Sequence, residues 1–178
     1  MSEDVRLVWM DLEMTGLVPD KDHILEIATI ITNNDLKTIA YGPELVIHQD
    51  QKILDAMDDW NQNHHRKSGL FEKVQQSKTS LEEAEAKTLE FIKAHVEENK
   101  GILAGNSIWQ DRRFIIKHMP QIDKYLHYRL LDVSTVKILA NSWYKLEPFS
   151  KKETHRARID IEESIQELSY YKKKCFIP

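Results

Sequence analysis

Cysteine, glycine and proline are all scarce in this sequence of 178 residues. The chain has a single cysteine, Cys175, with five glycines and five prolines. One cysteine cannot form an intrachain disulfide, which excludes a disulfide-stabilised secreted domain and favours a reducing, cytoplasmic compartment. Because no low-complexity segment or repeat is visible either, the composition excludes fibrous and disordered classes and indicates an ordinary globular protein.

Long hydrophobic runs are also absent. The most apolar run, residues 27–32, lies between Glu26 and Asp35 and is far shorter than the roughly 20 residues needed to span a bilayer. The N-terminal stretch MSEDVRLVW contains two acids and does not resemble a signal or transit peptide. We therefore expect no membrane association and one domain over residues 1–178, a length that can bury a sizeable core.

An excess of positive charge is missing too. The chain has 25 Lys and Arg residues against 29 Asp and Glu residues, so its formal net charge is −4. Non-specific affinity for a long nucleic acid comes from many Lys and Arg contacts to phosphates. If the ligand is a nucleic acid, it should therefore be short or held at a few positions.

Apolar periodicity predicts the order of the secondary-structure elements. The first half should contain three strands in an antiparallel meander, then helices, of which residues 80–99 form the clearest, with Ser80 as N-cap and Glu83 completing a capping box. The predicted strands cover residues 5–13, 23–32, 37–48, 102–106 and 128–133, and the predicted helices cover residues 51–63, 80–99, 110–119, 133–144 and 157–173. Alternation of strands and helices in the second half implies parallel neighbours, so we expect an α/β fold with a mixed sheet flanked by helices.

Two acids interrupt the first apolar strand, in the stretch WMDLEMTGL at residues 9–17. Asp11 and Glu13 are two positions apart, and strand side chains alternate between faces, so both carboxylates should point the same way. Like charges this close are costly in a partly desolvated place unless a cation neutralises them. The alternative is that they end the strand and face water.

Three later residues offer further polar chemistry. Asp111 lies near the C-terminal end of a predicted strand, where open α/β sheets bind ligands; the alternative is a first-turn acid that interacts with the helix dipole. His155 and Asp160 are five apart and can converge only if His155 lies on the loop before the last helix. The alternative for His155 is an exposed loop histidine.

Together, the DxE pair, the later aspartate and the HxxxxD spacing resemble the DEDD superfamily of 3′→5′ exonucleases, in the branch whose fifth residue is histidine. The segments DLEMTGL, MDDW, GNSIWQDRRF, HYRLLDVST and THRARIDIEESI are similar, in this order, to the oligoribonuclease family. The resemblance implies a ribonuclease H-like fold with a five-stranded sheet, in a single exonuclease domain. It also implies hydrolysis of very short single-stranded RNA, dinucleotides above all, to nucleoside 5′-monophosphates.

The resemblance implies catalytic roles for the five residues. Four carboxylates without a cysteine ligand suit Mg²⁺ or Mn²⁺ better than zinc. Asp11, Glu13, Asp111 and Asp160 are expected to hold two such ions. His155 is expected to act as the general base for the attacking water, since its ordinary pKa is near neutrality.

The resemblance also implies substrate contacts. Leu17 is expected to part the two terminal bases and Trp60 to form a stacking or packing wall, with core packing as the alternative for each. The remaining expected contacts are to the 5′-phosphate, from His65, Ser107, Arg129 and Ser134, and from Tyr128 of a second subunit. The chain should therefore be a homodimer.

The sequence departs from the family pattern at two positions. Ile159 stands where the family usually has a second acid before the last aspartate, and Trp109 stands where a smaller residue is common. The sequence is also compatible with two other functions. A proofreading-type DNA exonuclease would share the catalytic residues, and a catalytically inactive nucleotide-binding module would share the fold.

Overall fold

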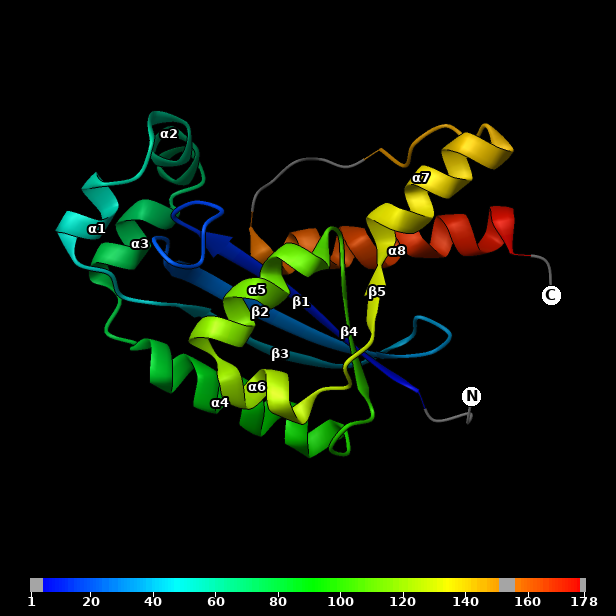
Figure 1. Ribbon diagram of the computed structural model, residues 1–178, viewed down its shortest axis with the longest axis horizontal. Helices are drawn as coiled ribbons and strands as arrows, with labels where there is room; N and C mark the ends of the chain where they lie inside the picture. Colours follow the sequence, from blue (N-terminus) through cyan, green and yellow to red (C-terminus); the bar gives the residue numbers. More distant parts are fainter. Residues whose placement is uncertain (1–4, 151–155, 177–178) are drawn as a thin grey trace.

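The computed structural model describes residues 5–150 and 156–176, and within them a mixed five-stranded sheet in the order β3-β2-β1-β4-β5 (Figure 1). The strands are β1 (Arg6–Met14), β2 (Ile24–Asn33), β3 (Thr38–Val46), β4 (Gly101–Gly105) and β5 (Leu130–Asp132). The first three strands pair antiparallel, whereas β4 runs parallel to both β1 and β5. The predicted meander and the predicted parallel second half are therefore both confirmed.

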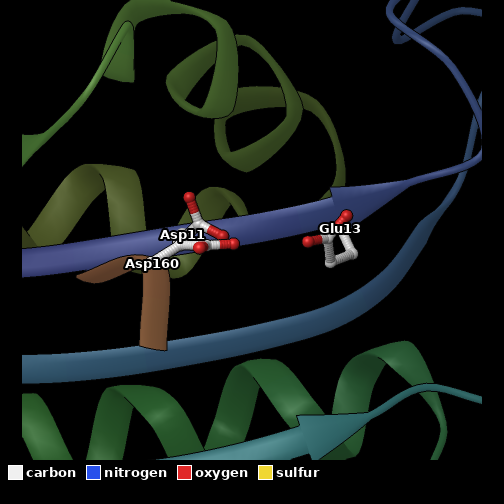
Figure 2. A group of neighbouring side chains, drawn as sticks. All are labelled: Asp11, Glu13 and Asp160. Carbon is white, nitrogen blue, oxygen red and sulfur yellow. The ribbon is translucent and has the colours of Figure 1, made fainter. Parts of the chain in front are cut away.

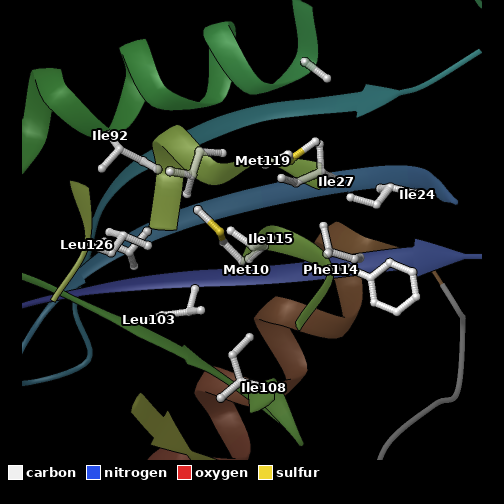
Figure 3. Packing of buried hydrophobic residues seen from close by; sticks show 14 of the residues in the cluster. Met10, Ile24, Ile27, Ile92, Leu103, Ile108, Phe114, Ile115, Met119 and Leu126 are labelled. Atoms are coloured by element: carbon white, nitrogen blue, oxygen red, sulfur yellow. The ribbon is translucent and has the colours of Figure 1, made fainter. Parts of the chain in front are cut away.

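Helices cover both faces of the sheet (Figure 1). One face packs against α4 (Leu81–His95), α5 (Ile108–His118) and α6 (Pro120–Tyr125), and the other against α7 (Val133–Tyr144) and α8 (Ala157–Cys175). Figure 3 shows the first of these layers, where Met10 of β1 lies among Phe114 and Ile115 of α5. This packing fixes α5 against the central strand.

The two faces of β1 have different partners because its side chains alternate. Val8 and Met10 point into the layer with α4 and α5, whereas Leu7 and Trp9 point into the layer with α8. Asp11 continues the odd-numbered series, as does Glu13. The strand therefore directs both acids toward the face that α8 covers.

Three short helices form a separate cluster at one end of the sheet (Figure 1). They are α1 (Gln51–Asp55), α2 (Asp59–Lys67) and α3 (Leu70–Gln76). The single helix predicted over residues 51–63 is wrong, because Asp58 begins a new helix by accepting a hydrogen bond from the Asn61 amide at 2.8 Å. Side-chain capping of this kind competes with continuation of the first helix.

Other helix ends show which local signals were reliable. Ser80 caps α4, as predicted, by accepting from the Glu83 amide at 3.2 Å. Pro120, which directly follows the helix predicted over residues 110–119, begins α6, where its missing N–H costs nothing. Within the described ranges, none of the helices combines the length and apolarity required to cross a bilayer.

Candidate active site

Three carboxylates meet where β1 passes the start of α8 (Figure 2). Asp11, Glu13 and Asp160 each offer an oxygen atom, and these oxygens all lie within 4.8 Å of one another. All three side chains are partly buried. Such a group of oxygens is suited to a hard divalent cation.

Asp111 approaches the same part of β1 from α5. Its Oδ1 accepts a hydrogen bond from the Leu12 amide at 3.0 Å, and only 7% of the residue is exposed. Leu12 lies between the two acids of β1, so Asp111 is fixed against the segment that carries them. Asp111 is also in the first turn of α5, so the predicted interaction with the helix dipole is compatible with this placement.

The surroundings make these carboxylates hard to ionise. Burial, followed by repulsion from Asp111 and Glu13, raises the pKa of Asp11 well above its ordinary value. Burial, followed by the charges of Asp160 and Glu26, raises the pKa of Glu13 to about 8. Burial also raises the pKa of Asp111 to about 7, although the Leu12 amide opposes the shift. A dication would stabilise the ionised forms of all three, so the donor set fits one.

A buried ion pair lies directly beside the acids. Glu26 is opposite Glu13 in the β1–β2 pairing and is fully buried. Its carboxylate accepts hydrogen bonds from Arg156 Nη2 at 3.0 Å and from the Ala157 amide at 3.3 Å. Sequence reasoning missed this pair, although an acid within the apolar stretch ILEIATI was a visible signal.

The predicted general base, His155, lies outside the described residues, so its role stays a prediction. The next residue along the chain, Arg156, is described and reaches Glu26 and Glu44.

A pocket of about 180 Å³ adjoins Glu13. It lies between the turn that follows β1 and helix α2, and its lining includes Leu17, Trp60, His64 and His65. Leu17 is 65% exposed and Trp60 is 67% exposed, so core packing is wrong for both. The Trp60 ring stacks on His64, with ring centroids 4.6 Å apart.

His65 lies in this pocket lining and is almost completely buried. Its Nε2 is 2.9 Å from the Met14 carbonyl oxygen, and its Nδ1 is 4.0 Å from Glu13 Oε2. A carbonyl oxygen can only accept, so Nε2 carries the proton and Nδ1 faces the acid. These contacts place His65 beside Glu13, and its predicted contact with a 5′-phosphate remains a prediction.

The turn that carries Leu17 is held from inside and from outside. Inside it, Asp22 accepts hydrogen bonds from the Val18 amide at 2.8 Å and from Thr15 Oγ1 at 3.0 Å. From outside, Gln110 Nε2 of α5 donates to the Leu17 carbonyl at 2.7 Å. The helix that positions Asp111 therefore also positions the predicted wedge.

Ser107 and Ser134, predicted to bind one phosphate, lie side by side. Their Oγ atoms are 3.1 Å apart. Asp132 Oδ1 accepts from the Ser107 amide at 3.0 Å and from the Ser134 amide at 2.8 Å, which fixes both residues. Ser107 is the N-cap of α5 and has a left-handed backbone (φ 49°).

A buried polar pair supports these serines from the α8 side, and sequence reasoning missed it. Glu167 is fully buried and accepts a hydrogen bond from Asn106 Nδ2 at 2.9 Å. Asn106 also reaches Ser134 Oγ at 3.4 Å. Nothing local marks Glu167, because its partner is 61 residues away in the sequence.

The other two predicted phosphate contacts lie just before β5. Tyr128 is 71% exposed and stacks on His127, with ring centroids 4.5 Å apart. Its carbonyl accepts from Arg112 Nη1 at 2.6 Å. Arg129 places its guanidinium 5.4 Å from the centre of the Tyr128 ring.

The two departures from the family pattern are both on the surface. Ile159, beside Asp160 on α8, is 41% exposed, and Trp109, on α5, is 54% exposed.

Solved structures similar to this chain include the zinc-bound complex of E. coli exonuclease I with single-stranded DNA, with a TM-score of 0.71 and 12% identity. Exonuclease I from Methylocaldum szegediense gives a TM-score of 0.69 at 14% identity. Each match covers 97% of this chain and 41% of the other. Identities this low show the fold alone, which is the DnaQ-type, ribonuclease H-like arrangement of the exonucleases.

Closer relatives match almost the whole chain. The oligoribonuclease of Pseudomonas syringae pv. syringae is 50% identical over 178 residues, which is 100% of both chains. The oligoribonuclease of Shewanella loihica is 48% identical over 177 residues, or 98% of each chain. The exonuclease family RNase_T matches residues 8–168. The chain therefore belongs to the RNase_T exonuclease family and, within it, to the oligoribonucleases.

Proposed function

We propose that the chain is a single-domain, cytoplasmic 3′→5′ exoribonuclease that degrades very short RNA, dinucleotides above all, to nucleoside 5′-monophosphates. One observation carries the proposal: the carboxylates of Asp11, Glu13 and Asp160 lie within 4.8 Å of one another, with Asp111 fixed against the same strand. Two-metal hydrolysis of a phosphodiester uses this kind of concentrated oxygen donor set.

The four acids are the proposed ligands of two Mg²⁺ or Mn²⁺ ions. When bound, these ions would supply an activated water and stabilise charge at the leaving 3′ oxygen. The hydrogen bond from the Leu12 amide holds Asp111 in place for this role. In the proposal His155 removes the proton from the attacking water.

Substrate selection comes from the surroundings of the acids. Leu17 and Trp60 border the pocket beside Glu13, where an exposed aromatic ring can stack on a base. Ser107, Ser134 and Arg129 are proposed to bind the 5′-phosphate through charge-assisted hydrogen bonds, with His65 as a further contact. A few such contacts would let a chain with a net charge of −4 bind RNA without a basic groove.

We also propose a homodimer in which Tyr128 completes the site of the partner. In the described chain the ring is 71% exposed. Helix α7 adds an exposed apolar surface, with Ile138 at 63%, Trp143 at 70% and Tyr144 at 55% exposed. Apolar surfaces of this kind commonly mark protein contacts. Sedimentation that finds an active monomer at assay concentrations would contradict the shared site.

The direct test is a turnover assay with a 5′-phosphorylated RNA dinucleotide in Mg²⁺ or Mn²⁺. We expect release of mononucleotides that disappears in the Asp160→Asn variant. A DNA dinucleotide and longer single-stranded DNA serve as comparisons. Equal or faster turnover of single-stranded DNA would favour a proofreading-type enzyme, and no metal-dependent turnover of any substrate would leave only a binding module.

A further inference from the structure

We infer that Arg156 is a positioning residue: bridged between Glu26 and Glu44, it sets the start of α8 and thereby places Asp160 against the acids of β1. The inference deepens the proposed function and rests on it. We refer to Glu26, Glu44 and Arg156 together as the Arg156 bridge.

The bridge is anchored in the core. Glu26 on β2 has no exposed surface, and a buried carboxylate is costly without a partner. Arg156 supplies that partner through Nη2 at 3.0 Å and Nε at 3.4 Å. The same guanidinium also donates to Glu44 on β3. The neighbouring strands β2 and β3 therefore both hold the side chain of Arg156, the residue that precedes α8.

The bridge also caps the helix. Arg156 is the N-cap residue of α8, and among the described residues its own side chain does not cap that helix. Instead, Glu26 Oε2 accepts from the Ala157 amide at 3.3 Å. A carboxylate at this position satisfies an end amide and suits the positive end of the helix dipole. The contact restricts both the rotation and the axial position of α8.

Asp160 is one helical turn beyond this anchor, and its amide donates to the Arg156 carbonyl at 3.0 Å. A shift or rotation at the start of α8 therefore moves the Asp160 carboxylate relative to β1. Glu26 pairs with Glu13 across the β1–β2 ladder, so the bridge is directly beside the acid group. Its guanidinium lowers the pKa of Glu13, whereas burial and the acids around Glu13 raise it.

The chemistry of arginine matters for this role. A guanidinium presents several donors in a rigid fork and can engage two carboxylates at once, whereas a lysine ammonium is a point charge on a flexible stem. Lysine at position 156 should keep the charge opposite Glu26 but lose the fixed geometry. The chain offers a matched control in Arg158, two residues further along α8, whose Nε is 3.7 Å from the partly exposed Glu162.

The experiment compares Arg156→Lys with Arg158→Lys. Mn²⁺ affinity is measured by calorimetry without RNA, and kcat and KM are measured on the RNA dinucleotide. We expect Arg156→Lys to lower Mn²⁺ affinity and kcat about tenfold each while KM changes less than threefold, because the ligand geometry and not the base pocket is disturbed. Arg158→Lys should stay near the wild type. Glu44→Gln, which leaves the buried pair intact, should give a smaller loss of about two- to fivefold.

Two results would overturn the inference. In one, Arg156→Lys matches Arg158→Lys in both Mn²⁺ affinity and kcat. In the other, Arg156→Lys lowers only the melting temperature, which would make the bridge a contribution to stability alone. If the wild type itself does not hydrolyse RNA, the proposed function fails, but the Mn²⁺ affinities of the variants still decide the role of Arg156.

Discussion

The acids of the candidate site and the side chains proposed to contact the bases are built in opposite ways. Asp111 is 7% exposed and tied to the backbone of β1. By contrast, Leu17 and Trp60 are each about two-thirds exposed. The acids are therefore partly or almost fully enclosed by the fold and depend on its packing, whereas the side chains proposed to contact the bases project from it.

The two regions also differ in how they affect the free energy of folding. Buried acids with raised pKa values cost folding free energy when they ionise, since the unfolded chain would leave them in water. Exposed side chains lose little when they are truncated. Substitutions in the acid group should therefore change catalysis, metal binding and stability together. Substitutions among the exposed side chains should change substrate binding and leave stability nearly unaffected.

The largest expected effect comes from removing a charge in the acid group. Asp11→Asn should lower kcat roughly 10³-fold, or about 4 kcal/mol, because a proposed metal ligand is lost. The same change should raise the melting temperature of the metal-free protein, since it removes repulsion among buried carboxylates. Turnover in Mg²⁺ checks the expected fall in kcat. Thermal unfolding of the metal-free protein checks the expected rise in melting temperature. Near-normal turnover in Mg²⁺ would remove Asp11 from the site.

Trp60→Ala tests the exposed region. It should lower kcat/KM on the dinucleotide about 10- to 100-fold, in line with roughly 1–3 kcal/mol for stacking on one base. The melting temperature should stay unchanged, because the ring is 67% exposed. Trp109→Ala is the matched control, since Trp109 is also exposed and does not line the pocket. A large fall in stability for Trp60→Ala would contradict the contrast between the regions.

The pH dependence of stability sharpens the comparison. Burial raises the folded pKa of Glu13 from 4.5 to about 8, so the folded state binds a proton more tightly than the unfolded state. Its contribution to stability is fully present below about 4.5 and is lost as the pH rises through about 8. The metal-free wild type should lose about 1–3 kcal/mol, or roughly 3–10 °C, relative to Glu13→Gln between pH 5.5 and pH 8.5. Parallel pH profiles for the two proteins would exclude a raised pKa at Glu13.

The smallest expected effect is at the contact between the two regions. Gln110→Met removes the nearer of two donors to the Leu17 carbonyl and leaves Arg113 Nη1 at 3.4 Å. An exposed hydrogen bond is worth about 0.5–1.5 kcal/mol. Dinucleotide affinity in Ca²⁺ should fall about two- to tenfold, while Ca²⁺ affinity without RNA stays unchanged. Equal dinucleotide affinity in the variant and the wild type would show that the turn does not need this anchor.

Regular patterns in the sequence predicted the parts that depend on local geometry. The alternation of strand side chains placed Asp11 and Glu13 together, and Ser80 marked the start of α4. The break between α1 and α2 was missed because the apolar spacing continues across it, although Asp58 is a residue type that favours N-caps over helix interiors. The Arg156 bridge was missed because Arg156 is 130 residues away from Glu26 in the sequence. Contacts of that kind depend on the completed sheet, so the acid within the apolar stretch is visible in the sequence but its partner is not.

The most direct test of the proposed enclosure of the 5′-phosphate is to measure turnover and affinity for RNAs of two, three, five and seven nucleotides, each with a 5′-phosphate. If Arg129, Ser134 and His65 enclose that phosphate, a longer chain cannot continue past them without displacing the contact. Loss of a charge-assisted contact costs about 1.5–3 kcal/mol, or roughly ten- to a hundredfold in affinity. We therefore predict that both turnover and affinity are highest for the dinucleotide and fall with length. Equal or rising affinity with length would contradict the proposed enclosure of the 5′ end.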